Sequence, residues 1–168
     1  MAVMSDWTGL YERFRRGPEI LAAALTGAAG AEIDWAPEDK WTVRQIAAHL
    51  ADSEIMVSAR VRSIIAEDNP TLPAYDQNAW AANLGYNKRR PSESLELFRR
   101  LRAANCELVK DASEATLART GTHTERGVLT LLQLTELAAA HVENHARQIG
   151  ELRRQFKAAG ARGAGGAV

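Results

Sequence analysis

The stretch AAAHVENHARQI, residues 138–149, places His141 and His145 four positions apart within a long amphipathic pattern. Residues separated by four lie on the same face of an α-helix, so both imidazoles point in the same direction. Two inward-facing histidines on one helix indicate a site for a metal ion. The stripe that they share is otherwise apolar, and its other members are Leu134, Leu137, Ala138, Ile149, Leu152 and Phe156.

Apolar residues also recur at helical spacing in three earlier segments, and no segment alternates as a half-buried strand does. The sequence therefore predicts an all-α antiparallel four-helix bundle with a long, partly helical loop between helices two and three. We expect the bundle to span residues 1–157, followed by a disordered, low-complexity tail over 158–168. The predicted long helices are 6–26, 43–67, 93–111 and 128–157, and a short helix is predicted at 77–84. The first of these is expected to bend near Gly17-Pro18. The predicted N-caps are Thr42 or Asp39 for helix 43–67, Asp76 for helix 77–84 and Ser92 for helix 93–111.

Composition excludes several classes of function. Lys plus Arg equals Asp plus Glu, at 21 each in 168 residues, so no basic surplus favours nucleic acid. No segment reaches the run of about 18 apolar residues that a membrane span needs. The single cysteine, Cys106, cannot form an internal disulfide and suits a reducing compartment. We expect a cytoplasmic protein whose partner is a small-molecule substrate.

The second helix offers a third inward-facing histidine, His49, on a stripe that also contains Ser53 and Arg60. A single histidine on such a face is more often a packed core residue. Three neutral imidazoles buried together without a metal, however, would leave ring nitrogens unpaired at a cost. The sequence thus predicts that His49, His141 and His145 hold one divalent ion. His123, in a polar segment, is predicted to be a loop residue outside this site.

The spacing of the histidines excludes other metal templates. The sequence contains no His-Glu-x-x-His and no Glu-x-x-His, and no cysteine accompanies the histidines. Three histidines with an open fourth position are typical of catalytic zinc sites, so zinc or nickel is the expected metal. Because ligation needs neutral imidazoles, the sequence alone predicts that metal affinity falls as the pH drops through about 6.5.

Further candidates lie near these ligands in the predicted helices and in the long loop. Asp52, Ser53 and Asn144 stand within one helical turn of a ligand. Arg60 is a charged residue on an apolar stripe, which packing alone does not explain. The candidate catalytic residues are therefore Arg60, Ser53 and Asp52. The candidate residues for binding a cofactor or substrate are Arg60, Tyr75 and Trp80, the last two from an aromatic loop suited to covering a pocket.

Several of these segments together resemble the DinB/YfiT-like superfamily of metal-binding four-helix bundles. They are WTVRQIAAHLADSE (41–54), Arg60, NPTLPAYDQNAW (69–80) and HVENHARQI (141–149). The resemblance implies a metal on His49, His141 and His145, and it implies a homodimer. Relatives of this kind include thiol S-transferases that use bacillithiol or mycothiol, and a mycothiol-dependent maleylpyruvate isomerase.

The leading functional hypothesis is a metal-dependent transferase that activates a low-molecular-weight thiol at the three-histidine site. Arg60 would hold a carboxylate of the thiol, and the aromatic loop would cover an apolar electrophile. One alternative is a metal-dependent hydrolase that uses a metal-bound water. Another is a non-catalytic metal- or ligand-binding bundle involved in a stress response.

Overall fold

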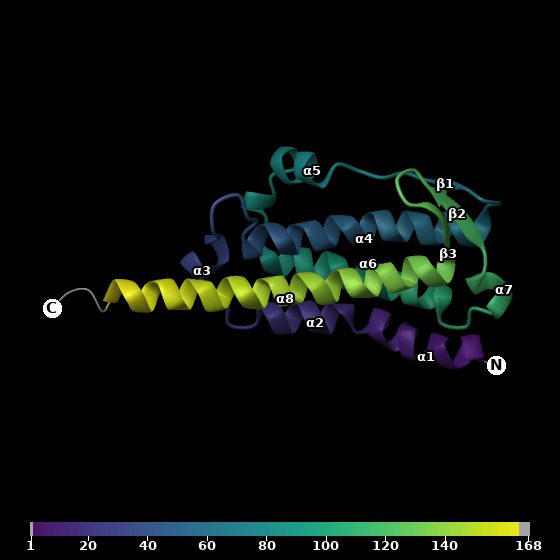
Figure 1. The fold of residues 1–168 in the computed structure, drawn as a ribbon, viewed down its shortest axis with the longest axis horizontal. Coiled ribbons are helices and arrows are strands. Elements are labelled where there is room, and N and C mark those ends of the chain that lie inside the picture. The colour runs from purple at the N-terminus through teal and green to yellow at the C-terminus, as the bar shows by residue number, and fades with distance from the viewer. Residues whose placement is uncertain (1, 165–168) are drawn as a thin grey trace.

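The four long helical segments of the chain lie side by side (Figure 1). The computed structural model describes the backbone of residues 2–164. The first segment is broken into α1 (Ala2–Arg15) and α2 (Gly17–Leu25), at the predicted bend. The others are α4 (Val43–Ala66), α6 (Pro91–Val109) and α8 (Leu131–Ala164). Because α4 and α2 each pack against both α6 and α8, the segments form a closed ring, and the predicted four-helix bundle is confirmed.

The helices of this bundle do not simply alternate in direction. Along the contact between α4 and α6, Glu54 bonds to Arg102 and Ser58 bonds to Asn105, so residue numbers rise together and the two helices are parallel. Where α4 meets α8, the directions are opposite (Figure 1). The reason is the long connection after α4, which returns the chain along the bundle before α6 begins.

This connection is partly helical, as the sequence predicts. It contains α5 (Gln77–Asn83) and a 3₁₀ helix, η1 (Tyr86–Lys88). Asp76 caps α5 by accepting hydrogen bonds from the backbone of Asn78 and Ala79. Two further short helices, α3 (Ala31–Asp34) and α7 (Glu114–Leu117), lie in other connections.

Local capping chemistry sets where the long helices begin. Thr42 caps α4 through a reciprocal capping box with Gln45, which selects Thr42 over Asp39. Helix α6 starts earlier than predicted: Arg90 is its N-cap in place of Ser92, because Pro91 fits the first helical position. Helix α8 continues to Ala164, so residues 158–164 of the predicted tail are helical, and residues 165–168 lie outside the described residues.

A small sheet, which the sequence analysis did not predict, covers one end of the bundle (Figure 1). Its strands are β1 (Thr71–Leu72), β2 (Thr120–His123) and β3 (Gly127–Thr130), in the order β1-β2-β3. Strands β1 and β2 are parallel, and β2 and β3 form an antiparallel hairpin. Strands this short display no recognisable alternation of apolar and polar residues, which is why the expectation of no strand was wrong.

Arg102 of α6 is buried in the core, at 1% exposure. Its guanidinium binds both carboxylate oxygens of Glu54, at 2.8 and 2.7 Å, and donates to the backbone carbonyl of Phe14. The rings of Phe14 and Phe98 lie 4.0 and 4.9 Å from its central carbon. A Cβ at Gly17 would lie 2.6 Å from Arg102 Nη1, so a glycine is needed here for close approach. These contacts fix how α2, α4 and α6 meet.

No helix among the described residues is both long enough and apolar enough to span a membrane. Cys106 is a buried free cysteine on α6. Burial raises the pKa of its thiol to about 11, as expected of a packed residue that does not react.

Candidate metal centre and adjoining cavity

The three histidines predicted from the sequence lie together where α4 packs against α8. His49 comes from α4, and His141 and His145 come from successive turns of α8. One ring nitrogen from each lies within 4.8 Å of the other two. The His49 and His141 Nε2 atoms are 3.0 Å apart, and the three ring centroids are separated by 4.6–5.0 Å. The antiparallel packing of α4 on α8 therefore creates the cluster.

The neighbours of the other ring nitrogens indicate which nitrogen is free in each histidine. Gln148 Oε1 lies 2.9 Å from His145 Nδ1 and accepts a hydrogen bond from its N–H, which leaves Nε2 of His145 with a lone pair. Ser53 Oγ lies 3.4 Å from His141 Nδ1, a longer contact. The His49 Nδ1 atom is buried and has no hydrogen-bond partner among the described residues. Trp41 covers the His49 ring, with centroids 4.9 Å apart.

Burial keeps all three imidazoles neutral. It lowers the pKa of His49 to about 3, with a further contribution from His141 and His145. It lowers the pKa of His141 to about 3 as well. The pKa of His145 is also lowered by burial, against an opposing effect of the hydrogen bond to Gln148. Because the pKa of each imidazole is lowered, protons should compete with a metal at a pH below the 6.5 expected from the sequence alone.

This donor set fits a divalent transition-metal ion. Nitrogens bound to one tetrahedral zinc ion at about 2.0–2.1 Å lie about 3.3 Å apart, close to the 3.0 Å between the His49 and His141 nitrogens. Neutral imidazoles are ligands that suit zinc and nickel. His123 does not belong to the cluster: it lies in β2, and its Nδ1 accepts a hydrogen bond from the backbone of Glu125.

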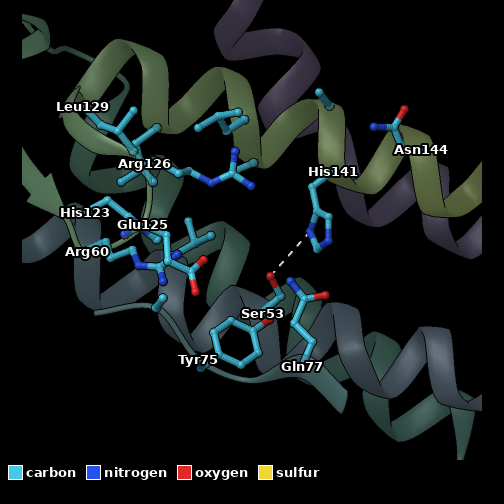
Figure 2. Close-up of a pocket in the computed structure, with 16 residues that line it drawn as sticks. Ser53, Arg60, Tyr75, Gln77, His123, Glu125, Arg126, Leu129, His141 and Asn144 are labelled. Atoms are coloured by element: carbon cyan, nitrogen blue, oxygen red, sulfur yellow. Dashed lines mark hydrogen bonds between the residues drawn. The ribbon is translucent and has the colours of Figure 1, made fainter. Parts of the chain in front are cut away.

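A cavity of about 260 Å³ adjoins the histidine cluster (Figure 2). His141, Ser53, Gln77 and Asn144 lie at one end of it. At the other end lie Arg60, His123 and Glu125, next to the β2–β3 hairpin, and Arg126 extends from this hairpin toward the middle of the cavity. Apolar side chains, among them Val57, Leu134, Leu137 and Ala138, complete the wall. The cavity is thus polar at both ends and partly apolar between them.

The structure separates the other predicted site residues into two groups. Ser53, Arg60 and Tyr75 line the cavity. Asp52 does not line it: its buried carboxylate accepts a 2.6 Å hydrogen bond from Arg89. Trp80 does not line it either, but it packs against Tyr75 with ring centroids 4.3 Å apart and so supports the cavity wall.

Sequence reasoning missed two residues at this site. Gln148 orients His145, and its spacing of three on the same helix was a signal that could have identified it. Arg126 lies in the turn between β2 and β3 and reaches into the cavity (Figure 2). It could not be found, because the hairpin itself was not predicted.

Comparisons with known proteins agree with the fold, and the relatives that they identify are named as metal-dependent. The family model of the DinB superfamily matches residues 13–149. A candidate metal-dependent hydrolase of Oceanobacillus iheyensis is 36% identical over 113 residues, 67% of this chain and 64% of the relative. YfiT of Bacillus subtilis, also named as a candidate metal-dependent hydrolase, is 30% identical over 117 residues, 69% of this chain and 66% of the relative. The chain thus spans just under two thirds of these relatives.

A solved structure extends the comparison to most of the chain. It is that of YfiT from Bacillus subtilis, described as a probable metal-dependent hydrolase with an unusual four-helix bundle topology. The TM-score is 0.83 at 26% identity, over 89% of this chain and 87% of YfiT. Because the family model matches residues 13–149, most of the chain, this chain belongs to the DinB superfamily.

Proposed function

We propose that this protein is a metal-dependent hydrolase of a small molecule, with His49, His141 and His145 as the ligands of one divalent ion, zinc or nickel. The observation that carries the proposal is that three neutral histidine nitrogens converge beside a cavity that His141 itself lines. The relatives named as candidate metal-dependent hydrolases support the same class of reaction.

Such an ion, when bound, polarises a carbonyl or phosphoryl oxygen and lowers the pKa of a coordinated water to about 7. The protein contributes the rest. The buried histidines stay neutral and add no negative charge to the site. Gln148 fixes the orientation of the His145 ring. Ser53 and Gln77 present polar groups to a substrate at the same end of the cavity (Figure 2).

One observation favours thiol transfer as a second candidate function. Of the described residues that line the cavity, Glu125 alone carries a carboxylate, and it lies at the end remote from His141 (Figure 2). No cavity carboxylate is therefore placed to take a proton beside the histidines. A thiol needs less help than water, because its pKa is about 8.5. Conjugation of a low-molecular-weight thiol, of the bacillithiol or mycothiol type, to an electrophile fits this site.

The two functions are separated by assaying the zinc- and the nickel-loaded protein on both kinds of substrate. Hydrolysis is followed with 4-nitrophenyl esters, and thiol transfer with 1-chloro-2,4-dinitrobenzene plus bacillithiol, mycothiol, glutathione or coenzyme A. We expect ester hydrolysis that is lost on chelation and in His49→Ala, and retained in Arg100→Gln on the exposed face of α6. Thiol conjugation without hydrolysis would replace the first proposal by the second. Metal binding with neither activity would favour a non-catalytic binding protein.

A further inference from the structure

Two arginines from distant parts of the sequence line the same cavity. Arg60 comes from α4, and Arg126 comes from the turn between β2 and β3 (Figure 2). The hairpin therefore brings a second positive charge to a cavity wall that α4 already supplies with one.

Neither guanidinium is neutralised by an acidic side chain. Unlike the half-buried Arg60, other partly or fully buried arginines of the described chain are ion-paired, among them Arg102 with Glu54, Arg89 with Asp52 and Arg153 with Glu32. Arg60 donates only to the backbone carbonyl of Pro73, and its buried Nε has no partner. Arg126 forms no hydrogen bond or ion pair with a described residue.

Arg126 is exposed, but the half-buried Arg60 guanidinium costs free energy, because its buried Nε–H loses water without gaining an acceptor. Here the cost is raised by the second positive charge. Burial lowers the pKa of Arg60, and the proximity of Arg126 lowers it further, while Tyr75 and Glu125 oppose this. Glu125 lines the same cavity but forms no ion pair with either arginine. Two arginines against one glutamate leave the cavity lining with an excess of positive charge.

We propose that Arg60 and Arg126 form an oxyanion subsite, which holds a carboxylate or phosphate group of the substrate. Planar guanidinium groups bind such oxyanions through paired, charge-assisted hydrogen bonds. The inference rests on the proposed function in one respect: the reacting bond lies at the histidine end. The substrate class is therefore a small molecule with an anionic group at one end, a hydrolysable or electrophilic group at the other, and a short apolar segment between them. Val57 and Leu137 line the wall where that segment would pack.

A binding measurement tests the subsite independently of activity. Calorimetric titrations would compare 4-phenylbutyrate, 2-phenylethyl phosphate and the neutral 4-phenylbutanamide, each with zinc-loaded and with metal-free protein. We expect at least one of the two anions to bind more tightly than the amide in both states, and the tighter of the two identifies the oxyanion. The metal-free arm excludes binding of the anion to the metal alone.

Single substitutions then locate the subsite. Arg126→Gln should weaken the anion about tenfold or more, the effect of losing one charge-assisted contact, and should leave the amide unchanged. Glu125→Gln should tighten the anion, because a competing negative charge is removed. Arg100→Gln, on the outer face of α6, is the matched control and should change neither. Arg126 is exposed, so its replacement does not endanger folding.

Kinetics distinguish failure of this inference from failure of the proposed function. The anionic mono-4-nitrophenyl glutarate is compared with the neutral 4-nitrophenyl butyrate. Arg126→Gln should raise KM for the anionic ester alone, with kcat little changed.

Hydrolysis of both esters with no response to Arg126→Gln would overturn the subsite and keep the hydrolase. If Arg126→Gln weakens binding of the anion but no ester is hydrolysed, the oxyanion subsite is kept and the hydrolase proposal is overturned. Equal binding of acid, phosphate and amide, or binding of none, would overturn the subsite.

Discussion

The imidazoles of His141 and His145 are oriented by contacts of different quality. Gln148 lies 2.9 Å from one ring and Ser53 lies 3.4 Å from the other. Hydrogen bonds to ligating histidines typically contribute about 10–100-fold to metal affinity. We expect Gln148→Leu to weaken zinc binding within that range, measured by competition with a chromophoric chelator. Gln155→Leu, a glutamine on the exposed side of the same helix, should have no effect. Equal affinities of both variants would show that Gln148 does not orient the ring.

The identity of the ligands is tested by metal content. His49→Ala, His141→Ala and His145→Ala should each lose the one ion per chain, because two imidazoles hold it far more weakly than three. His123→Ala should retain it, since His123 lies outside the cluster. Elemental analysis of the purified variants measures both results. A protein with both His141→Ala and His145→Ala that still holds one ion would contradict the assignment.

Burial of neutral histidines also predicts how the metal-free protein responds to acid. In the unfolded chain the histidine pKa is about 6.5. In the fold it is about 3 for His49 and His141. Between these values the unfolded chain binds more protons, so the free energy of unfolding falls as the pH is lowered below 6.5. We expect a loss of roughly 1–2 kcal/mol for each of the two histidines between pH 7 and pH 5.

Urea denaturation at several pH values measures this loss. The variant His49→Leu removes one of the two groups and should show a shallower dependence on pH. An equally steep dependence in that variant would mean that other groups cause it. Zinc should oppose the loss, because it binds the neutral form of the histidines.

At the scale of helices, the seam between α4 and α6 depends on a buried polar network. Arg102 and Asn105 of α6 bind Glu54 and Ser58 of α4. Arg102→Met would leave the Glu54 carboxylate buried without its counter-charge, which costs about 3–5 kcal/mol. We expect a loss of that size in the free energy of unfolding, measured by urea denaturation. Arg100→Met, on the same helix in an exposed pair with Glu96, should leave it nearly unchanged. Similar losses in both variants would contradict a specific role for the buried pair.

The same network explains the break in the first helical segment. Gly17 lies against Arg102, and Pro18 prevents a continuous hydrogen-bond ladder there. The sequence predicts the bend from Gly17-Pro18 alone, but the reason for the glycine is on another helix. Periodicity within one segment cannot indicate that an arginine from α6 fills the space beside it.

At the scale of the whole molecule, what could be predicted depends on whether the information is local. Spacings of three or four residues along the sequence predict the helices and the inward-facing side of each histidine. They also predict the Thr42 and Asp76 caps. The sheet depends on pairing between Leu72 and His123, and the parallel α4–α6 pair depends on the path of the connection. Both are long-range features. Asp52 was expected to face the site, but its partner Arg89 lies 37 residues further along the chain.

Homodimerisation stays a prediction, and it rests on the family resemblance. Sedimentation equilibrium over low to high micromolar concentrations measures it directly. A mass of twice 18.3 kDa is the expected result. A single-chain mass at the highest concentration would contradict it.

The separation of His49 and His141 along the chain has a consequence for unfolding. These two ligands are 92 residues apart, on the second and the last long segments of the bundle. An ion shared between them acts as a reversible cross-link that closes this loop. The entropy of closing a loop grows with the logarithm of its length, so a cross-link of this span constrains the unfolded ensemble more than a local one. We therefore expect removal of the ion to loosen the whole bundle and to make the chain more susceptible to proteases.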